Sequence, residues 1–227
     1  KKISIFLKSL KEPKCYVPSD ISKKYLKKIG KKLKKKLPKI DVNPIVDDFT
    51  SKKKINNKIL KNENIVVFFP GSTIGNFEKK EAIHFLRNIK LKYKPKKIII
   101  GVDLIKKKSV LLKAYNDKKG ITAKFNKNLL TRINKELNAN FDINSFRHSA
   151  IYNKSKSRIE MHLISLKNQK VKVQNKNFYF KKGETIHTES SHKYSPKSFN
   201  QLAKKSGWKV KKIWTDLNRQ FSIQYLI

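Results

Sequence analysis

The chain has 227 residues, enough for one substantial hydrophobic core or one core with a sizeable insertion, but few for two unrelated domains. No apolar run approaches the roughly 18 residues of a membrane span, and no charged-then-apolar leader is present, so we expect neither a membrane protein nor a secreted one. Cys15 is the single cysteine, which excludes an internal disulfide and favours a reducing, cytoplasmic location.

The formal net charge of +40 invites a nucleic-acid-binding interpretation, because lysine and arginine neutralise phosphates. Base recognition relies on the flat guanidinium of arginine, however, and only five of the 56 basic residues are arginines. Lysine is spread over every kind of segment, together with abundant asparagine and isoleucine. This dispersal favours the codon usage of an AT-rich genome over a selected polyanion-binding surface.

The first predicted elements alternate between strand and helix. The stretch CYVPSD indicates a strand that ends at Asp20, and residues 22–37 place five apolar side chains on one face of a lysine-rich helix. NENIVVFF indicates a buried strand, FEKKEAIHFLRNIK a helix, and KKIIIGVDL a second buried strand that ends at Asp103. This order is typical of a doubly wound α/β sheet.

The middle of the chain departs from this alternation. Residues 121–138 carry apolar side chains at four-residue steps, which predicts a helix, and RIEMHLIS, KVKVQ and NFYF then alternate like antiparallel strands. The α/β pattern resumes where Ser195 can cap a helix, Pro196 suits its first turn and Gly207 its end. Two strands, around WKVKKIW and FSIQYLI, close the chain.

The stretch VVFFPGSTIGNF, residues 66–77, joins a buried strand to a loop of small residues. Such a loop allows a ligand to approach the backbone closely. It lacks the Gly-Lys-Ser/Thr ending of a phosphate-binding loop. Asn76 has an ordinary alternative role as the N-cap of the next helix.

Five separated blocks closely resemble the histidine N-alpha-methyltransferases of ergothioneine biosynthesis: GSTIGNF, VDL, AYNDKKGITAKFNKNLLTRINKEL, RIEMHL and GETIHTESSHKYS. The resemblance implies an enzyme that trimethylates the α-amine of L-histidine to hercynine with S-adenosylmethionine. It also implies a Rossmann-like class I methyltransferase sheet, of α/β class, with an inserted α+β substrate-binding subdomain. The core would comprise residues 1–106 and 192–227, and the insertion residues 107–191.

The resemblance assigns a role to each residue of two sets. The cofactor-binding set is Lys2, Asp20, Asp48 and Phe49. In this set Asp20 would accept from the ribose hydroxyls, and Asp48 and Phe49 would contact the adenine, although Asp47 makes that register ambiguous. The substrate-binding set is Gly71, Thr73, Asn76, Tyr115, Met161, Glu189 and Ser191.

Within the substrate set, Asn76 and Tyr115 would hold the amino and carboxylate groups. Glu189 and Ser191 would bond to the two ring nitrogens, and Met161 would pack against the ring. Without the resemblance, Met161 is an ordinary core strand residue, and Glu189 and Ser191 are loop polars. No residue is assigned as the catalytic base.

The family's glycine-rich nucleotide motif and its N-terminal segment would precede residue 1. The chain therefore resembles a fragment, and we expect it to be unstable or inactive by itself. We also expect a monomer with no obligate protein partner and no metal, because the five histidines have no partners at zinc-binding spacing.

Three alternatives to histidine methylation stay open. The first two are a methyltransferase of the same fold that acts on RNA and one that acts on a tryptophan derivative. The third is a non-enzymatic basic protein that binds nucleic acid.

Overall fold

The computed structural model describes residues 2–51 and 64–227, and the chain forms two compact units. Unit 1 comprises Lys1–Leu60 and Asn88–Lys94, and unit 2 comprises Lys61–Arg87 and Pro95–Ile227. Helix α3 (Lys79–Tyr93) belongs to unit 2 at its start and to unit 1 at its end. No helix in the described ranges is long and apolar enough to cross a membrane.

The described residues of unit 1 form two further helices and two short pairs of parallel strands. Its elements are α1 (Lys2–Ser9), β1 (Cys15–Tyr16), β2 (Ser19–Asp20), α2 (Lys23–Lys36), β3 (Asp41–Val42) and β4 (Ile45–Val46). Strand β1 pairs with β3, and β2 pairs with β4. The stretch predicted as one strand is therefore two, separated by Val17 and Pro18, since proline has no amide hydrogen for a strand ladder.

Helix α2 confirms the helix predicted over residues 22–37. The Ser22 side chain caps it by accepting from the Tyr25 amide, and the buried positions include Leu26 and Leu33. The core of unit 1 consists of Leu7, Leu33, Leu37, Ile40 and Val42. Apolar periodicity thus identified both the helix and most of its buried face.

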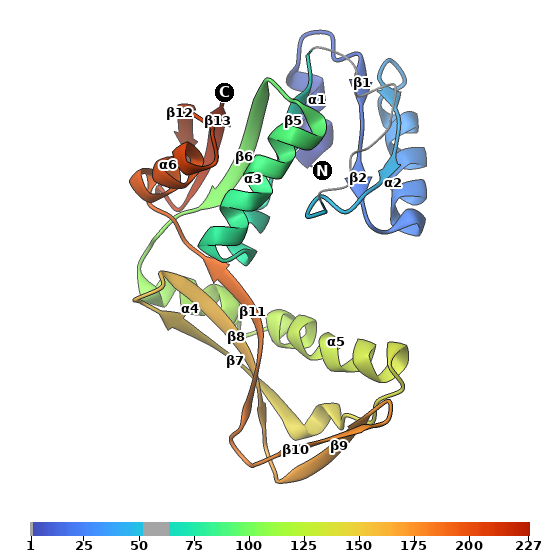
Figure 1. Ribbon diagram of the computed structural model, residues 1–227, viewed down its shortest axis with the longest axis vertical. Coiled ribbons are helices and arrows are strands. Elements are labelled where there is room, and N and C mark those ends of the chain that lie inside the picture. Colours follow the sequence, from blue (N-terminus) through green and yellow to red (C-terminus); the bar gives the residue numbers. More distant parts are fainter. Residues whose placement is uncertain (1, 52–63) are drawn as a thin grey trace. The chain divides into compact units, whose positions relative to one another are not determined.

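Unit 2 is built on a four-stranded sheet with the order β12-β13-β6-β5 (Figure 1). Its strands are β5 (Val66–Phe69), β6 (Lys97–Asp103), β12 (Val210–Thr215) and β13 (Phe221–Leu226). Strands β5 and β6 are parallel, whereas β13 runs antiparallel to both of its neighbours. All four strands confirm predicted ones, although residues 62–63 of the first prediction lie outside the described residues.

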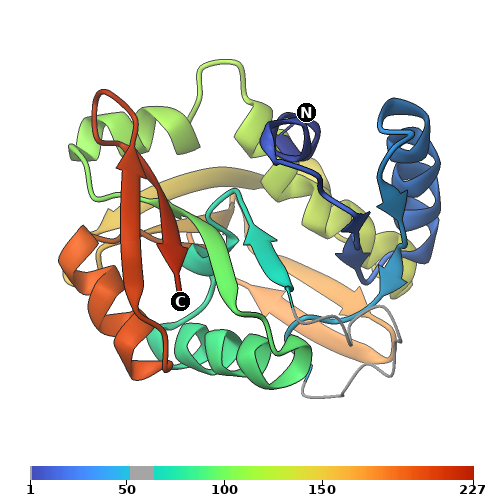
Figure 2. The ribbon, with the colours of Figure 1, turned by 90° about the horizontal axis from the view of Figure 1, so that it is seen from above.

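Helices α3 and α6 (Pro196–Lys205) lie on the same face of this sheet (Figures 1 and 2). The indole nitrogen of Trp208 donates to the Leu86 carbonyl at 3.0 Å and ties the end of α6 to α3. The predicted cap is confirmed, because Ser195 accepts from the Ser198 amide and Pro196 occupies the first turn. Gly207, just after α6, has a positive φ of 81°, as expected of a helix stop.

Apart from the 3-10 turn η2 (Thr73–Asn76), which follows β5, the remaining elements of unit 2 lie between β6 and α6. They are α4 (Lys108–Tyr115), α5 (Ile121–Glu136), the 3-10 turn η3 (Ile143–Ser145), β7 (Phe146–Asn153), β8 (Arg158–Ser165), β9 (Gln169–Val173), β10 (Lys176–Phe180) and β11 (Thr185–His192). An antiparallel sheet has the order β11-β8-β7, and β9 and β10 form a hairpin. The predicted subdomain boundaries at 107 and 191 fall within unit 2 and stay a prediction.

Helix α5 confirms the predicted helix, but its buried face differs from the stripe that predicted it. Ile121 and Phe125 are 64% and 65% exposed, whereas Asn126 and Leu130 are buried. Leu130 packs with the β-strand residues Phe146 and Leu163, so the helix turns the next row of residues inward. The four-residue spacing therefore indicated the helix without indicating its orientation.

Candidate functional site

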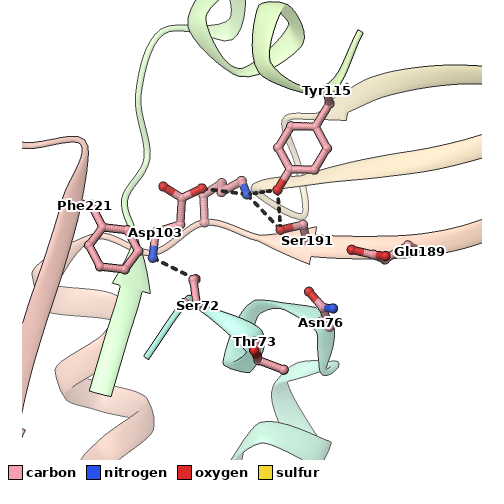
Figure 3. A pocket seen from close by; sticks show the side chains of 10 residues that line it. Ser72, Thr73, Asn76, Asp103, Tyr115, Glu189, Ser191 and Phe221 are labelled. Atoms are coloured by element: carbon pink, nitrogen blue, oxygen red, sulfur yellow. Dashed lines mark hydrogen bonds and ion pairs between the residues drawn. The ribbon is translucent and has the colours of Figure 1, made fainter. Parts of the chain in front are cut away.

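A polar pocket of about 360 Å³ lies at the carboxyl ends of β5 and β6 in unit 2 (Figure 3). Four of its residues follow β5: Gly71, Ser72, Thr73 and Asn76. Six come from elsewhere in unit 2: Asp103, Tyr115, Glu189, Ser191, Lys193 and Phe221. Open α/β sheets bind ligands at this edge, and the volume suits a small molecule.

The loop after β5 is held by the end of β6. Ser72 has a left-handed φ of 62°, which is uncommon outside glycine, and its hydroxyl accepts from the Asp103 amide at 2.8 Å. Gly71 has a φ of 88°, and a side chain built there would meet nothing within 4 Å. The loop thus turns sharply without placing bulk in the pocket, so Thr73 and Asn76 remain exposed to it.

The 3-10 turn η2 (Thr73–Asn76) packs directly against β11. A Cβ atom built on Gly75 would lie 2.7 Å from the His192 carbonyl oxygen, so only glycine allows this approach. Helix α3 begins at Lys79, and Asn76 therefore does not cap it. Instead its side chain points toward β11 in Figure 3 and is available to a ligand.

Strand β11 supplies the facing wall. Its register against β8 shifts between His187 and Glu189, which marks a β-bulge at Thr188. Bulges change the direction of the side chains that follow them. Beyond it, Glu189, Ser191 and Lys193 alternate along the chain and all line the pocket.

Lys193 lies at the centre of a buried hydrogen-bond network. Its side chain is 0% exposed, and its Nζ lies 2.8 Å from each of three oxygens: Asp103 Oδ2, Tyr115 Oη and Ser191 Oγ. The Tyr115 hydroxyl also donates to Ser191 Oγ at 2.9 Å. Asp103 is further paired with Lys106 at 2.6 Å, so the carboxylate holds two ammonium groups.

Tyr115 is fixed by the residues around the end of α4. The Asn116 side chain exchanges two hydrogen bonds of 2.9 Å with the backbone of Ala150 on β7. Asn126 donates to His148 Nδ1 at 2.9 Å, which leaves the His148 proton on Nε2, where it donates to the Tyr115 carbonyl at 2.8 Å. This chain of bonds explains why a polar residue, Asn126, is buried on α5.

The carboxyl group of Glu189 has a raised pKa. Burial is the main cause, since it disfavours the charged form, and the nearby Lys193 ammonium opposes the effect. The Glu189 carboxylate forms no hydrogen bond with the side chains or backbone of the described residues. A ligand that donates a hydrogen bond would therefore satisfy a half-buried acceptor.

The pocket brings together six of the seven predicted substrate residues: Gly71, Thr73, Asn76, Tyr115, Glu189 and Ser191. Met161 is the exception, because it is 3% exposed in a core cluster against which Tyr115 packs. Met161 pairs with Glu189 in the strand register. A direct contact between Met161 and a ligand stays a prediction.

The four predicted cofactor residues lie in unit 1. Asp20 ends β2, and its Oδ1 accepts from the Ser22 amide at 2.8 Å. Lys2 is exposed at the start of α1, and Phe49 is half-buried after β4.

The Asp47/Asp48 ambiguity now has a structural basis. Asp47 accepts from Lys92 at 2.6 Å and from the Tyr93 hydroxyl, so its carboxylate is occupied. Asp48 is exposed, and its carboxylate accepts from the hydroxyl and the amide of Thr50, the main cause of its lowered pKa. Asp48 is therefore the more available of the two for a ligand.

Sequence reasoning did not identify four of the lining residues: Ser72, Asp103, Lys193 and Phe221. Asp103 could have been predicted, since it ends a predicted buried strand at the edge of the sheet where ligands bind. Lys193 lay inside a recognised block but could not be distinguished from the other lysines by sequence. Within the described residues, no group of three or more His, Cys, Asp or Glu could hold a metal ion.

The fold and pocket define an α/β protein with a polar pocket sized for a small molecule. All 227 residues match the family described as histidine-specific methyltransferase, SAM-dependent. The chain belongs to this family, which confirms the resemblance seen in the sequence.

Curated relatives include two proteins named histidine N-alpha-methyltransferase. The protein from Mycolicibacterium smegmatis is 31% identical over 93% of this chain and 66% of its own length. The protein from Mycobacterium tuberculosis is 31% identical over 92% of this chain and 65% of its own length. A third, ergothioneine biosynthesis protein 1 from Schizosaccharomyces pombe, is 29% identical over 66% of this chain and 20% of its own length. The chain thus spans slightly less than two thirds of the first two relatives.

Proposed function

We propose that this chain is part of an enzyme that trimethylates the α-amine of L-histidine with S-adenosylmethionine, giving hercynine for ergothioneine biosynthesis. The proposal rests mainly on one observation: side chains from two sides of a single pocket face each other. Asn76 lies on one side, and Tyr115, Glu189 and Ser191 lie on the other (Figure 3). The names of the mycobacterial relatives support the same activity.

The substrate's imidazole is proposed to lie against Glu189 and Ser191. A neutral imidazole has one N–H donor and one acceptor nitrogen, which match a carboxylate and a hydroxyl. Satisfying both edges discriminates strongly against side chains that lack either group, because buried polar groups would be left unpaired. Glu189, whose carboxylate is half-buried and without a hydrogen bond among the described residues, gains most from such a ligand.

The α-amino and carboxylate groups are proposed to lie near Asn76 and Tyr115. The amine must be held as a free base with its lone pair oriented, and this alignment is the main task of the site. Small side chains in the loop 71–76 leave room for three methyl groups. Gly71, which adds no bulk beside the pocket, and the exposed Thr73 fit that requirement.

The residues present fit S-adenosylmethionine, which supplies an activated methyl group when it binds. Asp20 has one carboxylate oxygen bonded to Ser22 and a second available for a ribose hydroxyl. Asp48 is exposed and suited to an exocyclic amine, while Phe49 and Lys2 are proposed as further contacts.

The proposal is tested with the protein expressed from its complete reading frame. Incubation with S-adenosylmethionine and L-histidine should give three successive methyl additions by mass spectrometry, and Glu189→Gln should lose at least about 100-fold in kcat/KM. Methylation of RNA or of a tryptophan derivative, with histidine unchanged, would instead support one of the alternatives. Salt-sensitive retention on a polyanion column without any methylation would support a binding protein.

A further inference from the structure

Lys193 carries an inference that goes beyond the residues assigned to histidine binding. An ammonium group has three N–H donors, and the three oxygens within 2.8 Å of Lys193 Nζ use all of them. The side chain is fully enclosed, so it has no donor left for a ligand. Lys193 therefore acts on the pocket through the residues that it touches.

The two hydroxyls beside Lys193 are constrained by this arrangement. A hydroxyl oxygen accepts two hydrogen bonds and donates one. Ser191 Oγ accepts from Lys193 and from the Tyr115 hydroxyl, which fills both of its acceptor positions. Its own hydrogen has no acceptor among the described residues, so it is left for the pocket.

The constraint depends on the bond from the Tyr115 hydroxyl to Ser191 Oγ. While that bond is present, Tyr115 Oη accepts from Lys193 and has one acceptor position left, which suits the N–H of an amine. If Tyr115 donated to a ligand instead, the Ser191 hydrogen could turn to Tyr115 Oη, and Ser191 would face the pocket as an acceptor. The network as the structure has it thus favours an unprotonated nitrogen near Ser191.

We propose that Lys193 is a positioning residue that fixes Ser191 as a hydrogen-bond donor, so that the pocket selects histidine with a neutral imidazole. The inference rests on the proposed function and specifies the form of its substrate. Glu189 and Ser191, two residues apart beyond the bulge of β11, take the N–H and the bare nitrogen of the same ring. An imidazolium ion, which has two N–H groups and no acceptor, leaves the Ser191 hydrogen facing another donor.

The test compares Lys193→Met with a matched control, Lys106→Met, in the complete protein. Both lysines pair with Asp103, but only Lys193 touches Tyr115 and Ser191, and Lys106 remains to neutralise Asp103 in the first variant. Calorimetric titration with S-adenosylhomocysteine present should show histidine affinity reduced about tenfold in Lys193→Met. Lys106→Met should stay within about twofold, and S-adenosylhomocysteine affinity should not change in either variant.

Wild-type affinity for histidine in Lys193→Met would overturn the inference and leave the proposed function intact. Failure of the wild-type protein to bind histidine would refute the proposed function itself. Should Lys193→Met not fold, Lys193→Gln keeps a neutral donor of smaller size, and it should bind histidine more weakly than wild type. Unchanged affinity in that variant would equally overturn the inference.

A double-mutant cycle separates positioning from general support of the fold. If Lys193 acts through Ser191, then Lys193→Met should weaken histidine binding much less in a Ser191→Ala background than in wild type. If the fold-losses of histidine affinity in the two single variants multiply in the double variant, then Lys193 acts independently of Ser191. That result would contradict the inference.

Discussion

Gly75 and His192 bring the two walls of the pocket into contact: a Cβ atom on Gly75 would lie 2.7 Å from the His192 carbonyl oxygen. The obstacle is backbone, which cannot rotate away as a side chain does. This approach places η2, with Thr73 and Asn76, against the strand that carries Glu189 and Ser191.

Gly75→Ala should therefore separate these walls. We expect a loss of about 1–3 kcal/mol in the free energy of unfolding, together with weaker histidine binding. Gly120→Ala is the control, since that glycine has a φ of 65° but open space where a Cβ would lie. The control should lose stability by strain alone and keep its histidine affinity. Chemical denaturation and calorimetry give both quantities, and equal histidine affinity in Gly75→Ala and wild type would contradict the close-contact account.

Glu189→Gln should stabilise the ligand-free protein while weakening histidine binding. The pKa of Glu189 is raised above its ordinary value of 4.5, so the folded state retains a proton that the unfolded chain has released. Stability therefore falls as the pH rises through the window between the two values. The variant lacks this penalty, and its Tm at pH 7 should exceed that of wild type by about 2 °C, with the gain vanishing below pH 4.5. A Tm equal to or below that of wild type at pH 7 would argue against a carboxylate whose charged form is disfavoured by burial.

Asp47 and Asp48 should respond differently to the same substitution. Asp47→Asn weakens bonds to Lys92, whose side chain is 2% exposed, and to Tyr93, so we expect a loss of about 1–3 kcal/mol in stability. Asp48→Asn should leave stability nearly unchanged but reduce S-adenosylhomocysteine affinity about tenfold. Denaturation and calorimetry on both variants check this contrast. If only Asp47→Asn lost S-adenosylhomocysteine affinity, the adenine contact would be assigned to Asp47 instead of Asp48.

Met161 should influence histidine through Tyr115. It is buried in a cluster with Leu111, Ala150 and Ile159, and Tyr115 packs against that cluster. Met161→Ala should cost about 2–5 kcal/mol of stability and weaken histidine binding, whereas Met161→Leu should cost under about 1.5 kcal/mol and leave binding unchanged. A large loss of histidine affinity in a stable Met161→Leu variant would indicate direct contact with the ring.

Much of the fold could be predicted from local patterns. The strands β6 and β8 and the cap at Ser195 follow from apolar runs and turn residues, which act over a few neighbouring positions. The short side chains of the loop after β5 likewise predicted a ligand site, and six predicted substrate residues line one pocket. These features depend on local sequence and on a resemblance spread over five blocks.

The parts that could not be predicted depend on tertiary contacts. Lys193 is one lysine among many, and only the convergence of Asp103, Tyr115 and Ser191 gives it a distinct role. On α5 the more exposed row of residues has the more regular apolar spacing, and the buried row contains the polar Asn126. Hydrogen bonds to His148 and His162 hold Asn126 inward, and apolar periodicity cannot predict such bonds. Without the family resemblance, Glu189 and Ser191 of β11 are interpreted as loop polars, since the polar sequence of this strand gives little apolar signal.

The proposed hydrogen bonds of Glu189 and Ser191 to the imidazole are tested most directly by nitrogen NMR of ring-labelled histidine bound to the complete protein. We predict one protonated and one unprotonated ring nitrogen at neutral pH, with shifts that differ from free histidine and that change when Glu189 is replaced by glutamine. Bound histidine with both nitrogens protonated, or with ring shifts indifferent to that replacement, would contradict the assignment of this pocket to histidine.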